Sequence, residues 1–332
     1  MDNLTHTLTG LMLARAGLAR LTPGATAIAI LAANLPDIDA VSAVHGSAVY
    51  LEHHRGPTHG LLLIPAMALL PVAVVWPFVR SRLQWRGAYG VSVIALLSHL
   101  LMDWTNIYGI RLLAPYSERW YRLDITSVVD PWILLVLIVC SLWPLLSRLV
   151  SGEIGARTRP GYGLARFALA LILLYEGGRF LIHQRAVETL EARMHAGRLP
   201  FRVAAFPHLA NPLRWTGLAE IDTAYVLHDV RLSGAFDPDA GRVFYKTAHS
   251  PQLEAAKNTA AFRSFLLFSQ FPLWRVLPVA EPQGGHQVEA SDLRFGLPGE
   301  GRFAAVCILD TDGMPLRSWF QFGPPGLPPR PR

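Results

Sequence analysis

The chain contains 332 residues, of which 52% are hydrophobic and 16% are charged, and its mean hydropathy is +0.30. Soluble domains carry about a quarter charged residues, so this composition excludes a disordered chain and indicates a protein that lies partly in a membrane. Asp and Glu number 10 in residues 1–183 and 14 in the shorter remainder, residues 184–332. The two parts are therefore expected to lie in different solvents, the first in lipid and the second in water.

The formal net charge of +6 and the pI of about 9.6 would suggest a nucleic-acid partner in a soluble protein. Only two of the 30 basic residues are lysines, however, and many arginines lie in short loops beside apolar segments, where positive charge sets membrane topology. No basic stripe with interleaved aromatic residues is visible, so we do not expect a nucleic-acid partner. Cys140 and Cys307 lie far apart and predict no disulfide framework.

Six hydrophobic segments follow one another in the first part of the chain. Residues 60–79 are 20 consecutive uncharged residues, about the length that crosses a hydrocarbon core of roughly 30 Å. The first segment is short and contains three threonines, and the last is interrupted by Arg166 and Glu176, so either could fail to span. The sequence predicts an all-α membrane bundle of five or six spans within residues 1–183, from the segments 4–20, 24–44, 60–79, 88–108, 128–148 and 163–182.

The arginines predict the orientation of this bundle. The loops on one side hold nine arginines and those on the other side hold four, and positive charge is retained in cytoplasmic loops. The side with nine is therefore expected to be cytoplasmic, and the C-terminal part is expected to be extracytoplasmic. The first residues carry no positive charge before an apolar run, so we expect no cleavable signal peptide. The nine are Arg15, Arg20, Arg80, Arg82, Arg86, Arg148, Arg157, Arg159 and Arg166.

Residues 184–323 have the charge density and turn signals of a soluble α+β domain. A helix is expected over Arg185–Arg198 and mostly helix over Gln252–Gln270. Asp312-Gly313 is a hairpin turn signal between two predicted strands. Residues 324–332 contain five prolines and two arginines and are expected to be a disordered tail. The predicted strands are Tyr225–Phe236, Arg242–Ala248, Gln287–Phe295, Phe303–Leu309 and Leu316–Phe322.

Ionisable residues within the apolar segments are candidates for a functional site, because burying them in a membrane is costly. His99 and Asp103 are four residues apart, so a helix places them on one face, where they could bind one ion. They could instead be a polar pair that joins two helices. Asp37 and Asp39 follow Pro36, which interrupts a helix, and their oxygens suit a cation, although Asp37 could equally cap a turn and Asp39 be solvated.

The loop before the third segment contains His54, Arg55 and His59. The two histidines are five residues apart with Gly56-Pro57 between them, so both rings could point inward as zinc ligands, and the guanidinium of Arg55 suits a phosphate or a developing oxyanion. A solvated histidine cluster at the membrane surface is the alternative. In an alternating topology His99 and Asp103 lie in the outer half of their segment. The outer ends of the first three segments carry His6, Asp37, Asp39 and His59. This convergence on one leaflet favours one shared site.

Four motifs in this order resemble the YdjM family of inner-membrane, metal-dependent hydrolases. They are Met1-Asp2 with Thr5-His6 and Gly10, then Pro36-Asp37-x-Asp39, then His54-Arg55-Gly56-x-Thr58-His59, then His99-x-x-x-Asp103 with Tyr108-Gly109. The resemblance covers about residues 1–150 and implies a bacterial inner-membrane hydrolase with a divalent metal centre. Members of this family often have serine after the second loop histidine, where this chain has Gly60.

Zinc is the metal that we expect. The predicted ligands outnumber the four of one tetrahedral zinc, so either two ions bind or some residues support the ligands. As a hydrolase, the protein would use Asp37 or Asp39 as a base and Arg55 to hold an anionic substrate, with membrane lipids, such as a phospholipid or other lipid ester, as substrate and amides or peptides as the rival. A transporter or an ion-binding protein is the alternative. The predicted ligands are His6, Asp37, Asp39, His54, His59, His99 and Asp103.

Overall fold

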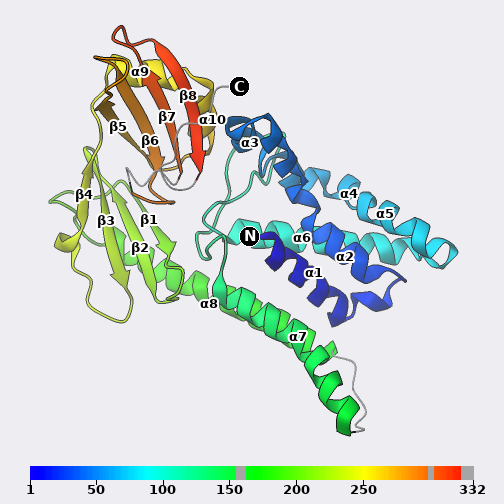
Figure 1. Ribbon diagram of the computed structural model, residues 1–332. Helices are drawn as coiled ribbons and strands as arrows, with labels where there is room; N and C mark the ends of the chain where they lie inside the picture. The colour runs from blue at the N-terminus through cyan, green and yellow to red at the C-terminus, as the bar shows by residue number, and fades with distance from the viewer. Residues whose placement is uncertain (155–161, 298–302, 323–332) are drawn as a thin grey trace.

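The computed structural model describes residues 1–154, 162–297 and 303–322 (Figure 1). A helical part comes first, and a part built from two β-sheets follows it. This confirms the prediction of a helical region and a C-terminal α/β region. The predicted tail, residues 324–332, lies outside the described residues, as do Arg157 and Arg159, which were used to orient the bundle.

The helical part begins with α1 (Asn3–Ala16), which starts where the Asp2 side chain accepts a hydrogen bond from the Thr5 amide at 3.0 Å. The next helix, α2 (Ala25–Asn34), changes at Leu35 into a 3-10 helix, in agreement with the interruption predicted at Pro36. The remaining segments are η1 (Leu18–Arg20), η2 (Leu35–His45), α3 (Ser47–His53), η3 (Pro57–His59), η4 (Leu61–Leu63), α4 (Ile64–Met67), α5 (Leu69–Val79), η5 (Arg80–Arg82), α6 (Trp85–Thr105), α7 (Pro131–Ile154) and α8 (Tyr162–Glu191).

Three helical stretches among the described residues are long and apolar enough to cross a membrane: Ala25–His45, Leu61–Arg82 and Trp85–Thr105. Pro131–Pro144 is a shorter apolar helix. Asp130 caps α7, because its Oδ1 accepts hydrogen bonds from the amides of Trp132 and Ile133.

Close packing of α1, α2 and α6 forms the core beneath the candidate site. Ile28, Ala29, Ala32 and Ala33 of α2 are fully buried there. Small residues let helix backbones approach closely. At Gly10 of α1, a Cβ atom would lie 2.7 Å from the carbonyl oxygen of Ala29, so this position accepts only glycine without a shift of the helices.

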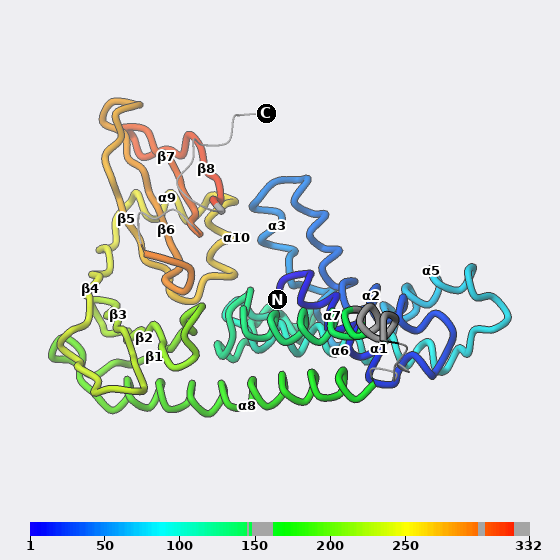
Figure 2. Tube along the Cα trace, turned by 60° about the horizontal axis from the view of Figure 1, so that its bottom comes forward, coloured from blue at the N-terminus to red at the C-terminus, as the bar shows by residue number. Residues whose placement is uncertain are grey.

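The C-terminal part contains two four-stranded antiparallel sheets, each with its strands in sequence order. The strands β1, β2 and β5 were not predicted, and the helix expected over Arg185–Arg198 was wrong beyond Glu191, where α8 ends. Figure 2 shows α8 as a long rod that reaches the first sheet, so this helix runs without interruption across the predicted boundary at residue 184. The elements are β1 (Arg202–Pro207), β2 (Arg214–Glu220), β3 (Ala224–Arg231), η6 (Pro238–Ala240), β4 (Arg242–Tyr245), α9 (Pro251–Lys257), α10 (Ala260–Phe268), β5 (Pro272–Pro278), β6 (His286–Asp292), β7 (Phe303–Leu309) and β8 (Pro315–Phe322).

Candidate metal centre

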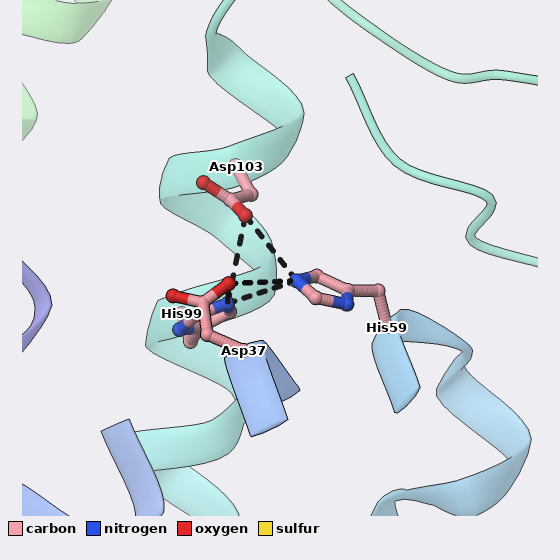
Figure 3. A group of neighbouring side chains, drawn as sticks. All are labelled: Asp37, His59, His99 and Asp103. Carbon is pink, nitrogen blue, oxygen red and sulfur yellow. Dashed lines mark hydrogen bonds and ion pairs between the residues drawn. The ribbon is translucent and has the colours of Figure 1, made fainter. Parts of the chain in front are cut away.

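Four of the predicted ligands meet in one buried cluster: Asp37 of η2, His59 of η3, and His99 and Asp103 of α6 (Figure 3). One potential ligand atom from each lies within 4.8 Å of the others. The Nε2 atom of His59 is 3.1 Å from Nε2 of His99, 3.6 Å from Oδ1 of Asp37 and 3.4 Å from Oδ2 of Asp103. The i, i+4 spacing thus places His99 and Asp103 on one face of α6, and the other two segments bring their side chains to that face.

Hydrogen bonds behind the two histidines fix which ring nitrogen faces the cluster. His99 donates from Nδ1 to the carbonyl oxygen of Ala33 at 2.7 Å, so its Nε2 lone pair points inward. His59 has its Nδ1 3.1 Å from the Thr58 hydroxyl oxygen and 3.3 Å from Oδ2 of Asp39. A proton on that nitrogen again leaves Nε2 free. This is the arrangement in which second partners orient histidine ligands toward a metal ion.

Asp39 lies behind the cluster and organises the loop that carries His59. Its Oδ1 is 2.8 Å from Nδ1 of His54, and its Oδ2 accepts hydrogen bonds from the Arg55 amide at 2.8 Å and from the Thr58 hydroxyl at 2.9 Å. Asp37, Asp39 and His54 also form a second group whose potential ligand atoms lie within 4.8 Å of one another. Both oxygens of Asp39 are nevertheless occupied by donors from the loop.

Arg55 points into the protein. Its Nη2 is 3.1 Å from Oδ1 of Asp103, and its Nη1 donates to Oδ1 of Asn106 and to the carbonyl oxygen of Gly109, each at 3.2 Å. The residue is only 3% exposed. Asn106 also donates to Oδ1 of Asp103 at 3.1 Å. Sequence reasoning missed Asn106, although its position three residues after Asp103 offered a signal, because the next turn of a helix lies on the same face.

His6 lies at the edge of the cluster. Its ring stacks on that of His99 with a centroid distance of 3.8 Å, and its Nε2 is 3.4 Å from Oδ1 of Asp103. The amino group of Met1 also contacts Asp103. His6 is fully buried, and neither of its ring nitrogens has a hydrogen-bond partner among the described residues. The structure therefore brings His6 beside the four-residue cluster and places its Nε2 toward the same carboxylate.

The residues of the cluster fit a divalent metal ion. Buried polar atoms that lack a partner cost free energy, and such atoms gather here: among the described residues, Oδ2 of Asp37, Oδ2 of Asp103 and both ring nitrogens of His6 have no hydrogen-bond partner. Imidazole nitrogens and carboxylate oxygens are the ligands that zinc and similar ions take in proteins. A cation among them would satisfy the orphaned oxygens.

Burial sets the protonation of the loop residues that lie outside the apolar helices. Burial lowers the pKa of His54, against the opposing effect of its hydrogen bond to Asp39, and so favours a neutral imidazole. Burial also lowers the pKa of Arg55 and raises that of Tyr108. Arginine starts from a pKa so high that its guanidinium stays charged at pH 7. A neutral His54 ring therefore lies in the same loop as one buried cation, Arg55.

Gly60 follows His59 at the position where serine is common in the family that the motifs resemble. A Cβ atom at this position would lie 2.4 Å from the carbonyl oxygen of Ala114 and 3.2 Å from that of Pro57. Both are backbone atoms, which cannot rotate away. In this chain, therefore, the backbone at Ala114, in the loop after α6, occupies the space that a serine side chain would need.

Comparison with known proteins supports this description of the helical part. Residues 1–186 match the family described as "YdjM inner membrane protein", which is more than half of the chain. The chain belongs to the YdjM family. The resemblance predicted from the four motifs is thereby confirmed, and the apolar helices are those of a YdjM-type membrane protein.

Residues 251–322 match a second family, described as "YfhP C-terminal alpha/beta plait domain". The chain is also similar to "Uncharacterized protein YfhP" of Bacillus subtilis (strain 168), with 30% identity over 143 residues. That match covers 40% of this chain and 43% of the relative, so less than half of the relative's length is matched. No solved structure matches the chain.

Proposed function

We propose that the protein is a membrane-bound, metal-dependent hydrolase that acts on a phospholipid or another lipid ester. The observation that carries this proposal is the convergence of Asp37, His59, His99 and Asp103, with unpartnered carboxylate oxygens buried among the rings. In the proposal His59, His99 and Asp103 bind one ion, zinc being our first choice, and His6 packs at the edge against the His99 ring and Asp103. Three protein ligands with a position left open are typical of catalytic zinc sites.

A bound zinc ion would supply Lewis acidity toward water and toward the ester oxygen. The protein would supply the proton transfers. Oδ2 of Asp37 is free of hydrogen-bond partners, and Asp37 lies beside both histidines, so it can take the proton of an attacking water. The water oxygen bonds to the phosphorus or carbonyl carbon, the ester bond breaks, and the proton passes from Asp37 to the departing oxygen.

Asp39, His54 and Arg55 then act behind the reacting groups. The hydrogen bonds of Asp39 hold His54 and the loop of His59, and Arg55 holds Oδ1 of Asp103, which leaves Oδ2 toward the ion. The sequence predicts that Arg55 holds an anionic substrate. Both of its Nη atoms bind protein groups in the structure, so in the proposal Arg55 orients Asp103 instead.

A lipid substrate is favoured by the surface beside Asp37. Ile38, Val41 and Val44 lie three residues apart on the 3-10 helix η2, and this spacing places them in one stripe. Their exposed fractions are 60%, 67% and 64%. An exposed apolar stripe next to a polar cluster suits an amphiphile, whose tails can stay in hydrocarbon while its headgroup reaches the site.

For the membrane topology we propose five or six spans with a periplasmic C-terminal part. The support is the arginine distribution, and α3, which follows the candidate span Ala25–His45, lies beside α10 and β8 (Figure 1). Labelling of an exposed engineered cysteine, Ser233→Cys, tests the orientation, since Cys140 and Cys307 are buried. The cysteine of Ser233→Cys is expected to react with a membrane-impermeant reagent in intact spheroplasts. If it does not react, the C-terminal part is not periplasmic and the proposal is contradicted.

The metal is tested by elemental analysis of the purified protein. The wild type is expected to hold a stoichiometric divalent metal, and a His59→Ala, Asp103→Ala double variant is expected to lose it. Asp229→Ala, a carboxylate removed from the exposed face of β3, is the matched control and should keep the metal. Equal metal in all three proteins would refute the site.

The hydrolase is tested by incubating metal-loaded protein in detergent with extracted bacterial lipids and following products by mass spectrometry. Wild-type protein should release cleaved lipid, and Asp37→Asn should not. Cleavage that is equal in both proteins, or that is seen only with a peptide library, would remove the lipid proposal.

A transporter that uses the same cluster is the second candidate. Its support is Glu176, a buried carboxyl of α8 that accepts a hydrogen bond from the Thr105 hydroxyl at 3.1 Å, two residues from Asp103. Metal-dependent ion flux into proteoliposomes that is lost in Glu176→Gln, without any lipid product, would favour it over the hydrolase.

A further inference from the structure

The core of the C-terminal α/β region extends into the helical part. Leu51 of α3 and Tyr108, which lies in the loop after α6, are buried in one cluster with the aromatic residues of α10 and β7. The Ser47 hydroxyl at the start of α3 also donates to the carbonyl oxygen of Phe320 at 2.9 Å. Both segments flank the candidate metal centre: α3 ends one residue before His54, and Tyr108 follows Asp103 by five residues.

Tyr108 is the point at which this core meets the site. Its ring centroid is 4.5 Å from that of Phe268, 5.9 Å from that of Phe295 and 6.3 Å from that of Phe303. The guanidinium of Arg55 lies over the same ring, with its Cζ 4.6 Å from the centroid. A guanidinium over an aromatic face is held by a cation–π interaction, which is stronger where water is excluded.

The backbone around Tyr108 is held from the same side. Arg294, which pairs with the buried Asp292 at 2.8 Å, donates from Nη1 to the carbonyl oxygen of Ile107 at 3.1 Å. The amide of Tyr108 donates to Oδ1 of Asn106 at 2.8 Å. Asn106 in turn contacts both Arg55 and Asp103. A continuous set of contacts therefore leads from the second sheet to the carboxylate of Asp103.

We propose that Tyr108 is a positioning residue, and that the α/β region of residues 251–322 serves as the wall that holds it. The aromatic residues of that region fix the Tyr108 ring, the ring fixes the guanidinium of Arg55, and Arg55 orients Asp103. The inference rests on the proposed function for its link to metal binding, while the positioning itself is a property of the metal-free protein. In this proposal the α/β region contributes to the geometry of the metal site, because it holds the residue that orients Arg55 and Asp103.

Paired variants of the full-length protein test the positioning. Phe268→Leu replaces an aromatic ring that contacts Tyr108 with a smaller aliphatic side chain. Phe262→Leu is the matched control, because it makes the same change on the same helix at a ring that stacks on Trp274. Tyr108→Leu removes the aromatic ring that the Arg55 guanidinium lies over. Tyr108→Phe keeps that ring and loses only a hydroxyl that has no hydrogen-bond partner among the described residues.

The first measurement is hydrogen exchange of the metal-free proteins, in the peptides that cover residues 54–60 and 105–110. Phe268→Leu and Tyr108→Leu should exchange about tenfold faster there, as expected for loss of a buried cation–π contact. Phe262→Leu and Tyr108→Phe should match the wild type. Equal acceleration by the two phenylalanine variants, or none in Tyr108→Leu, would overturn the proposal.

The second measurement is the affinity of each protein for Co²⁺, together with the visible spectrum of the bound ion. Tyr108→Leu should bind about tenfold more weakly with an altered spectrum, and this effect should shrink in an Arg55→Ala background, because the ring acts through Arg55. Full additivity of the two changes would contradict this route. Absence of Co²⁺ binding by the wild type would refute the proposed function and leave the exchange result to decide the positioning.

Discussion

Asp39→Asn should weaken metal binding without abolishing it. Asp39 holds four groups: it accepts from the Arg55 amide and the Thr58 hydroxyl, and it faces a ring nitrogen of both His54 and His59 at 2.8 Å and 3.3 Å. Asparagine keeps one acceptor oxygen, but an NH₂ group replaces the other oxygen. The donors that bind that second oxygen in the wild type then face another donor. Loss of such a supporting carboxylate reduces metal affinity by about 10- to 100-fold, or about 1.4–2.7 kcal/mol.

Competition of the protein with a calibrated chelator measures this loss, and Asp229→Asn is the control with the same change of charge on an exposed strand. An affinity within twofold of the wild type would refute the supporting role. A loss as complete as that of Asp103→Ala would show that Asp39 is itself a ligand. The thermal stability of the metal-free variant should also fall, because the loop donors lose a partner.

Three further outcomes are expected. Gly60→Ser should lower thermal stability by about 1–3 kcal/mol and weaken metal binding, because its Cβ would meet the carbonyl oxygen of Ala114, and a neutral result would show that the loop yields easily. Burial, with a smaller contribution from His195, lowers the pKa of His228 from 6.5 to about 4. Between pH 7 and 5 this histidine therefore stays neutral in the folded protein, whereas in the unfolded chain it takes up a proton. Stability should therefore fall by up to about 2 kcal/mol as the pH drops from 7 to 5, and His228→Gln should flatten that slope; equal slopes in both proteins would contradict it. Val41→Asn should reduce lipid cleavage and leave metal content unchanged, as product and elemental analysis would show.

The sequence contained enough to predict the cluster, because each part rests on a local rule. The i, i+4 spacing of His99 and Asp103 sets their common face, and Pro36 sets the end of the second helix. The alternation of apolar segments then brings Asp37 and His59 to the same end. The direction of Arg55 could not be predicted, since its partners come from a different segment and are defined only by the folded backbone.

The missed strands have physical reasons of their own. In β2, Gly217 lies against Leu190 of α8, where a Cβ atom would come within 2.9 Å of the leucine methyls. Glycine and alanine have low strand propensity, so β1 and β2 lack the usual signal, and β5 both begins and ends with proline. Packing against α8 and pairing with neighbouring strands override those local preferences.

Formal charge predicts that one divalent ion binds, and not two. Three carboxylates, those of Asp37, Asp39 and Asp103, share the buried site with one guanidinium, that of Arg55. Burial lowers the pKa of His54 and of the Met1 amino group, which favours their neutral forms. The three carboxylates thus exceed the guanidinium by two negative charges, and an unbalanced charge of this size is costly in a buried site.

One divalent ion removes that imbalance, whereas two ions would replace it with an equal positive excess. Elemental analysis against a quantified protein concentration should therefore give one metal per chain, and Asp39→Asn should lower the affinity without halving the number of sites. Two metals per chain, with one lost in Asp39→Asn, would instead assign Asp39 and His54 to a second ion. The supporting role of Asp39 would then be wrong, because its oxygens would have to leave the loop donors to bind that ion.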